Sequence, residues 1–166
     1  MGAGKTTIGR RLADLLGWEF VDSDREIEAR TGADIPLIFD IEGEAGFRRR
    51  EKEVIAGLMD REGMVLATGG GAILDPDTRR LLRDRARVVY LKASPEQSLA
   101  RTARDRRRPL LQTEDPKGRL EALLAERDPL YRETAHLVVD TGGRGIHSVA
   151  NEILRRTGLR RVGGPR

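Results

Sequence analysis

The chain has 166 residues, a net charge of +4 and no cysteine, and 38% of its residues are hydrophobic. That length suits one domain with a sizeable core, and the lack of cysteine excludes disulfides and thiolate metal sites. No apolar run approaches the roughly 20 residues that a membrane helix needs and no targeting signal is recognisable, so we expect no membrane role and a cytoplasmic location.

Helical and strand patterns alternate along the chain. We predict short strands at 19–21, 64–67, 88–91 and 137–139. Between and beside them, helical patterns lie at 8–16, 44–61, 76–85, 95–104, 118–126 and 148–156. Ser23 and Glu26 read as the capping box of a further helix, and 128–132 reads as a break between two helical pieces. This alternation predicts an α/β fold with a parallel sheet covered on both faces.

The strongest local motif is the glycine-rich run at residues 2–7, directly before the first helix. Glycines let successive backbone N–H groups point at phosphate oxygens, and the helix N-terminus adds positive charge there. In such a loop Lys5 reaches the β- and γ-phosphates, and the Thr6 hydroxyl binds Mg²⁺. An ordinary glycine-rich helix start is the alternative, but Gly4-Lys5-Thr6 leads straight into an amphipathic helix.

The phosphate-loop motif normally has an earlier glycine and follows a strand, and neither precedes Gly4 here. We therefore predict that the first strand of the fold is missing from this sequence. Two strand spacings, about 9–10 Å, would then separate its neighbours and open the core.

Asp22 and Asp24 stand where a predicted strand ends and a helix begins, which is where parallel sheets build sites. Phosphoryl transfer needs a metal beside the phosphates and a group that orients the attacking hydroxyl, so two carboxylates suit it. The alternative for Asp24 is a purely structural interaction with the helix dipole. Gly69, Gly70 and Gly71 follow another strand and allow close approach to a ligand, or form only a flexible turn.

Arginines supply most of the positive charge. They suit an anionic small-molecule site, a nucleic-acid surface or an ordinary solvated surface. Residues 101–108 are a dense basic stretch without apolar periodicity, which indicates a flap that closes over nucleotide. A nucleic-acid binder should interleave aromatic residues with its basic patches, and aromatics are only 4% of this chain. We expect no nucleic-acid partner.

In order and spacing, the motifs resemble those of the shikimate kinase family over essentially the whole chain. The matching pieces are 1–10, 22–24 with Ile27-Glu28, Gly43-Glu44, Phe47-Arg48, 68–72, 108–111 and 127–131. The resemblance implies a P-loop NTPase-type three-layer fold with a five-stranded parallel sheet of order 2-3-1-4-5. It implies ATP- and Mg²⁺-dependent phosphoryl transfer to a hydroxyl of shikimate, giving shikimate 3-phosphate and ADP. We expect one monomeric domain over 1–158, with a substrate-binding segment at 23–61, a lid at 104–116 and a disordered basic tail at 159–166.

The resemblance also implies roles for individual residues. The residues that contact ATP would be Gly2, Ala3, Gly4, Lys5, Thr6, Thr7, Arg108 of the lid and Arg144 beside the adenine. Thr6 would bind Mg²⁺, and Asp22 would hold the metal through water. The residues that contact shikimate would be Asp24, Arg48, Gly69, Gly70, Gly71 and Arg127, the two arginines clamping its carboxylate. The catalytic set would be Lys5, Asp22, Asp24 and Arg108, with Asp24 orienting or deprotonating the attacking hydroxyl.

Two other interpretations stay open. A gluconate kinase would share the phosphate loop and the acidic pair, but should lack the triple glycine together with the Arg-Pro-Leu-Leu lid at 108–111. A catalytically inactive relative is disfavoured by the presence of Lys5, Asp22, Asp24 and Arg48, whereas the missing strand favours impaired activity.

Overall fold

The structure is a computed structural model that describes residues 3–102 and 113–163. Helices and strands alternate along these residues, as predicted. The elements are α1 (Lys5–Leu16), β1 (Glu19–Asp22), α2 (Ser23–Thr31), α3 (Ile35–Leu58), β2 (Met64–Ala67), η1 (Ala72–Leu74), α4 (Pro76–Arg85), β3 (Val89–Lys92), α5 (Pro95–Thr102), α6 (Pro116–Thr134), β4 (Leu137–Asp140) and α7 (Ile146–Thr157).

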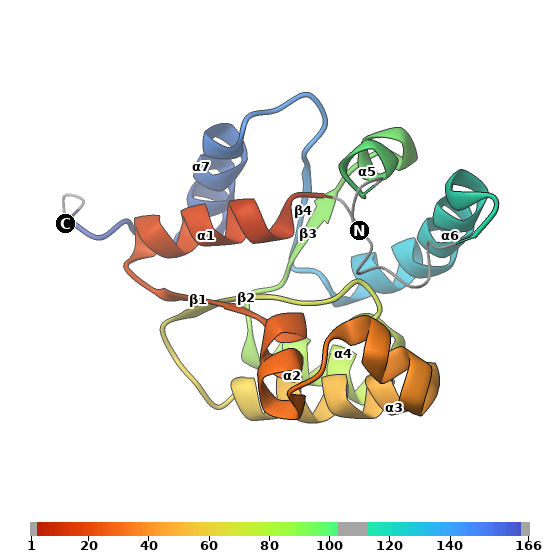
Figure 1. The fold of residues 1–166 in the computed structure, drawn as a ribbon. Coiled ribbons are helices and arrows are strands. Elements are labelled where there is room, and N and C mark those ends of the chain that lie inside the picture. The colour runs from red at the N-terminus through yellow and green to blue at the C-terminus, as the bar shows by residue number, and fades with distance from the viewer. Residues whose placement is uncertain (1–2, 103–112, 164–166) are drawn as a thin grey trace.

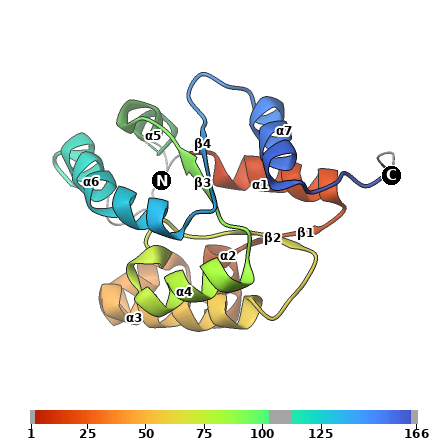
Figure 2. The ribbon, with the colours of Figure 1, turned by 180° about the vertical axis from the view of Figure 1, so that it is seen from behind.

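Helices cover the strands on two sides. Figure 1 shows α1 and α7 on one side and α2, α3 and α4 on the other, and the reverse view in Figure 2 shows the same division. Helices α5 and α6 lie side by side, beyond the end of β3. In the described part of the chain, no helix combines the length and the apolar character required to cross a bilayer.

The strands form two parallel pairs. Strand β1 pairs with β2 in the register Phe20 to Val65, and β3 pairs with β4 in the register Tyr90 to Val138. Among the described residues, β2 and β3 share no strand pairing. A cavity of about 670 Å³ lies between the pairs, lined by both strands and by apolar residues of α1. The predicted strands are thus confirmed, and they stand as two pairs on either side of an apolar cavity.

Each strand pair has its own hydrophobic core. Helix α1 packs against α7 and β4 through residues such as Leu12 and Val139. Helices α2 and α3 pack against β1 through residues such as Ile27 and Val54. The second core fixes α3 against the end of β1, and this positions the segment that follows Asp22.

Two local predictions were wrong. Asp22, not Ser23, caps α2, because its carboxylate Oδ1 accepts hydrogen bonds from the N–H groups of Asp24 (2.9 Å) and Arg25 (3.4 Å). Helix α6 continues through Pro129 to Thr134, where a break was expected. A proline inside a helix removes one backbone hydrogen bond, and buried Leu120, Leu123 and Thr134 anchor α6 on both sides of it.

A helical segment before Glu44 was missed. Helix α3 begins at Ile35 because the Asp34 side chain accepts from the Leu37 N–H (3.0 Å) and Pro36 suits the first turn. Gly43 interrupts it with φ of 70°, a conformation that other residues rarely adopt. The helical segment predicted from Glu44 is therefore the second half of α3, which ends at Leu58.

The tail is described only as far as Gly163. There the Val162 N–H donates to the Leu15 carbonyl at 2.9 Å, so this part of the predicted basic tail runs back to the end of α1.

Ile55 and Ile41 give a matched test of the core, because both lie on α3 but only one is buried. Ile55 is 0% exposed and Ile41 is 73% exposed. We expect Ile55→Ala to lower the free energy of unfolding by about 2–5 kcal/mol through lost burial and a cavity. Ile41→Ala should change it by less than about 0.5 kcal/mol. Urea unfolding of both variants measures the difference, and equal effects would contradict the described packing.

Candidate active site

The phosphate loop leads into α1 through a left-handed glycine. Gly4 has φ of 83° and its carbonyl accepts the first bond of the helix, from the Ile8 N–H at 2.9 Å. The first N–H groups of a helix have no partner within it, and together with the helix dipole they attract anions. The sequence prediction of an anion-binding helix start at Lys5 therefore has the required backbone geometry.

A cavity of about 410 Å³ opens at this helix start. It is lined by residues 3–8, by Arg101 and Thr102 of α5, and by Thr141, Arg144, Ile146 and Val149 around the start of α7. Arg144 is held there by an ion pair with Glu152 (2.6 Å) and a hydrogen bond to the Asp140 carbonyl (3.1 Å). The structure thus brings Arg144 to the same cavity as Lys5 and Thr6, although they lie at opposite ends of the sequence. Gly2 and Arg108 lie outside the described residues.

The two aspartates diverge at the end of β1. Asp22 uses Oδ1 to cap α2, whereas Asp24 lies against the glycine turn that follows β2. Ser23, fully buried between them, accepts a hydrogen bond from the Gly69 N–H at 3.3 Å. The start of α2 is therefore joined directly to that turn.

Charged side chains lie directly against the backbone of Gly69 and Gly71. A Cβ on Gly69 would lie 2.9 Å from Glu51 Oε2 and 3.0 Å from Asp24 Oδ1. A Cβ on Gly71 would lie 2.2 Å from Arg48 Nη2. A side chain at either position would therefore displace a carboxylate or a guanidinium, so these glycines allow the close approach of the charged groups to the turn.

Arg48 and Glu51 form the polar centre of this cluster. They are one turn apart on α3, and Arg48 Nη1 lies 2.7 Å from Glu51 Oε1. The pKa of Glu51 is raised to about 7, mainly by burial. The positive charge of Arg48 acts in the opposite direction, and the nearby charge of Asp24 adds a smaller contribution to the increase. Glu51 is 2% exposed, and a carboxyl group this buried is stable as an anion only with partners.

Helix α6 closes the cluster from the far side of the turn. The Tyr131 hydroxyl donates to the Gly70 carbonyl at 2.6 Å, and Arg127, one turn earlier on α6, is 3% exposed. Glu51 Oε2 and the Nε atoms of Arg48 and Arg127 are buried without a hydrogen-bond partner among the described residues. Buried polar atoms normally have partners, so these converging groups suit a polar ligand that carries both negative charge and hydroxyls.

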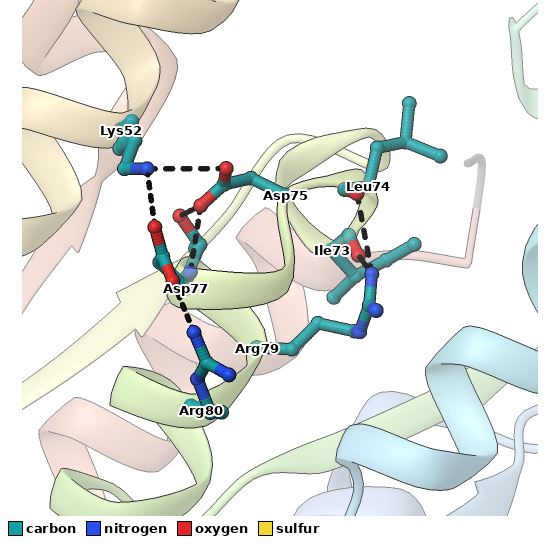
Figure 3. Close-up of polar contacts among 8 residues, drawn as sticks. Lys52, Ile73, Leu74, Asp75, Asp77, Arg79 and Arg80 are labelled. Atoms are coloured by element: carbon teal, nitrogen blue, oxygen red, sulfur yellow. Dashed lines mark hydrogen bonds and ion pairs between the residues drawn. The ribbon is translucent and has the colours of Figure 1, made fainter.

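A second set of contacts fixes the segment after the glycine turn (Figure 3). Lys52 reaches Asp75 (3.2 Å) and Asp77 (2.9 Å), and Arg79 donates to the Ile73 carbonyl (2.7 Å). Hydrogen bonds with Asp77 and Asp75 raise the pKa of Lys52. The segment is thereby attached to α3 next to Glu51, and this holds the glycine turn beside the Arg48–Glu51 pair.

The structure brings together most of the predicted site residues. Asp24, Arg48 and the three glycines meet in one cluster, while Lys5, Thr6 and Arg144 line the neighbouring cavity. Lys5, Gly69, Gly70 and Tyr131 all line the large cavity between the strand pairs, so the two regions adjoin. In the described part of the chain, no three His, Asp or Glu side chains group as a metal site.

Sequence reasoning missed Glu51, Ser23 and Tyr131 as members of the cluster. The spacing of Arg48 and Glu51, three apart on a helix, was a signal for their pairing. Nothing local in the sequence indicates that Tyr131 reaches a carbonyl 61 residues away.

Comparison with known proteins gives one consistent result. The family model described as "Shikimate kinase" matches residues 1–157. A shikimate kinase of Burkholderia pseudomallei is 60% identical over 154 residues, which cover 93% of this chain and 84% of that protein. One of Nitrosococcus oceani is 55% identical over 165 residues, covering 99% of this chain and 87% of that protein.

Solved structures agree with the sequence relatives. The shikimate kinase from Acinetobacter baumannii in complex with shikimate superposes with a TM-score of 0.93 at 54% identity, covering 95% of this chain and 88% of that one. The shikimate kinase from Aquifex aeolicus superposes with a TM-score of 0.82 at 33% identity, covering 95% and 92%. The described fold is thus the P-loop NTPase fold of these kinases.

The raised pKa of Glu51 predicts a pH-dependent stability. Between its ordinary value near 4.5 and about 7, the folded state binds more protons at Glu51 than the unfolded state. Stability from this group is therefore lost as pH rises through that range, by roughly 3 kcal/mol, since one pKa unit corresponds to about 1.4 kcal/mol. We expect Glu51→Gln to gain about that much relative to wild type between pH 4.5 and 8 in urea unfolding. Glu53→Gln, at an exposed position two residues along the same helix, is the control. A stability difference between Glu51→Gln and wild type that does not vary with pH would contradict the prediction.

Proposed function

The chain belongs to the shikimate kinase family, and we propose that the cluster around Gly69–Gly71 holds shikimate beside the phosphate loop. Members of this family transfer the γ-phosphate of ATP, with Mg²⁺, to a hydroxyl of shikimate in aromatic amino acid biosynthesis, and this is the reaction of the present chain. What remains is to assign its own residues to the steps of binding and transfer.

One observation carries the assignment: an arginine pair and two carboxylates meet at a glycine turn whose backbone the charged groups approach directly. Shikimate carries one carboxylate and several hydroxyls, so its site requires cationic groups at one end and hydrogen-bond acceptors at the other. Arg48 and Arg127 supply guanidinium groups, which bind a carboxylate by paired hydrogen bonds. Gly70 contributes backbone contact, for which the lack of a side chain is necessary.

Asp24 is the group placed for the attacking hydroxyl. Its carboxylate lies against Gly69, the residue that Glu51, the partner of Arg48, also approaches. A carboxylate there accepts a hydrogen bond from the substrate hydroxyl and so orients a lone pair of the hydroxyl oxygen toward the γ-phosphate. It takes up the proton of the hydroxyl as the new O–P bond forms. The proposed catalytic set is accordingly Lys5, Asp22, Asp24 and Arg108, although Arg108 lies outside the described residues.

Lys5 and the loop around it bind the nucleotide in this proposal. The N–H groups at the start of α1 face the phosphates of ATP, and Lys5 places its charge on the β- and γ-phosphates. Arg144 lies across the cavity, on the side proposed for the adenine. Proximity and charge neutralisation by these groups are the main requirements of phosphoryl transfer.

Thr6 and Asp22 are the proposed magnesium ligands. Both offer oxygen donors, the kind Mg²⁺ prefers, and Asp22 keeps Oδ2 clear of the two cap bonds, which go to Oδ1. Magnesium in kinases takes only one or two protein ligands besides water and phosphate, so the lack of a larger described acidic group agrees with this donor set. When bound, Mg²⁺ offsets the charge on the transferred phosphoryl group.

We extend the proposal to the setting of the enzyme. It acts as a monomer in the cytoplasm on small molecules alone, without nucleic acid or membrane. Gluconate, the acceptor of another kinase of the same broad fold, is the comparison for this assignment. The arginine pair would attract the carboxylate of either acid, so a direct comparison of the two acceptors tests the selectivity of the site.

A coupled ADP-release assay with shikimate, with gluconate and with no acceptor tests the function. We expect turnover that depends on shikimate and on Mg²⁺, with gluconate close to the background without acceptor. Turnover with gluconate, or none with shikimate in protein shown to be folded by its cooperative unfolding, would contradict the assignment.

Asp24→Asn tests the role of the carboxylate in the same assay. Removing a general base from the transition state should lower kcat by at least about 100-fold, with a smaller change in KM for ATP. Asp40→Asn, at an exposed position on α3, is the matched control and should retain wild-type kcat. Similar activity of the two variants would show that Asp24 is not the group that receives the proton.

A further inference from the structure

Tyr131 joins two parts of the proposed shikimate site that are far apart in the sequence. Its hydroxyl donates to the Gly70 carbonyl at 2.6 Å, linking α6 to the glycine turn. Its own helix carries Arg127 four residues earlier, and residues four apart on a helix lie on the same face. Tyr131 therefore stands between the arginine and the turn that are proposed to meet the substrate.

Arg127 lies close enough to the Tyr131 hydroxyl to affect its ionisation. Burial raises the pKa of Tyr131, and the charge of Arg127 and a hydrogen bond from it act in the opposite direction. Arg127 is 3% exposed, so its guanidinium cannot satisfy its donors with bulk water. The buried guanidinium thus lies close to the tyrosine oxygen, one turn along the same helix.

The Tyr131 ring is itself held in place. It packs against Tyr90 with ring centroids 4.8 Å apart. The Tyr90 hydroxyl donates to Asp128 Oδ1 at 2.8 Å, and Asp128 pairs with Arg132 at 2.8 Å. The ring contact anchors Tyr131 to β3, so its hydroxyl has a fixed position from which to act.

The donor count of a phenol decides the direction of the contacts. Tyr131 has a single O–H donor, and the Gly70 carbonyl takes it, so the lone pairs of its oxygen are left for a nearby cation. Arg127 is close enough to act on this oxygen through its charge. The hydroxyl is thus bonded to the glycine turn and lies near the guanidinium.

We propose that Tyr131 is a positioning residue for substrate binding. By bonding the Gly70 carbonyl, it fixes α6 against the glycine turn and so holds Arg127, one turn earlier on the same face of α6, where its guanidinium meets the carboxylate of shikimate. The proposal rests on the proposed function of the cluster, and it adds a residue to which the sequence motifs give no role.

Tyr131→Phe removes the hydroxyl and keeps the ring, and Tyr90→Phe is its matched control. Losing the hydrogen bond that fixes α6 to the Gly70 carbonyl should raise KM and Kd for shikimate about 10-fold in Tyr131→Phe. In the same variant, kcat and KM for ATP should stay within about twofold of wild type. Tyr90→Phe, which loses a phenol hydroxyl directed at Asp128, should leave KM for shikimate within about twofold. Unchanged shikimate binding in Tyr131→Phe would overturn the proposal.

The methyl ester of shikimate distinguishes a specific effect of Tyr131→Phe on the orientation of Arg127 from a general loss of structure in the variant. It lacks the negative charge that Arg127 is proposed to meet, so Tyr131→Phe and wild type should bind it within about twofold of one another. Equal losses for acid and ester would mean that Tyr131 only supports the fold, and would overturn the positioning role. Wild-type protein that binds no shikimate would instead sink the proposed function, which is a separate outcome.

A measurement on the unmutated chain covers the case in which Tyr131→Phe does not fold. The chain has two tyrosines, so labelling with 3-fluorotyrosine gives two ¹⁹F signals, which Tyr90→Phe assigns. Shikimate should shift the Tyr131 signal more than the Tyr90 signal, and the methyl ester should shift it less than shikimate does. A Tyr131 signal that shikimate leaves unmoved would contradict the proposal.

Discussion

The site depends on one constraint, which is that the backbone at Gly69 and Gly71 is covered directly by charged side chains. The Glu51 and Asp24 carboxylates occupy the space of a side chain on Gly69, and Arg48 occupies that on Gly71. Three segments can therefore converge: the start of α2, the second half of α3 and the turn after β2. Because the buried Glu51 carboxylate is compensated mainly by Arg48, displacing either would leave an unpaired buried charge, which proteins rarely tolerate.

Much of the fold could be predicted from the sequence, and the errors have local physical causes. The four strands were evident because each is a short apolar run with turn signals on both sides. The start of α2 was misplaced because Ser23 and Asp22 are both good caps, and only the burial of Ser23 against Gly69 decides between them. The first part of α3 was missed because it spans only two turns before Gly43. The continuation of α6 through Pro129 depends on packing, which local propensity does not report.

The site could be predicted only where its residues belong to motifs. Lys5, Asp24 and Arg48 stand in short patterns whose order along the chain is distinctive. Glu51 lies outside every matching piece, and Tyr131 ends the piece at 127–131 without an evident role; the importance of both comes from what they touch, a guanidinium in one case and a distant carbonyl in the other. Residues that act by holding another residue leave little trace in a single sequence, so the structure was needed to find them.

The division of the strands into two pairs has a consequence for how the molecule opens. Within the described residues β2 and β3 exchange no backbone hydrogen bonds, so the cavity edge of each pair lacks the ladder that protects amides in a continuous sheet. Helix α1 spans the division, since it packs on β2 and also on α7. Amide exchange should accordingly separate the two halves into distinct cooperative units, with α1 as the element whose opening exposes both. Arg48 belongs to one half and Arg144 to the other, while Arg127 lies on α6, which the Tyr131–Tyr90 contact joins to β3, so the proposed shikimate site spans the division.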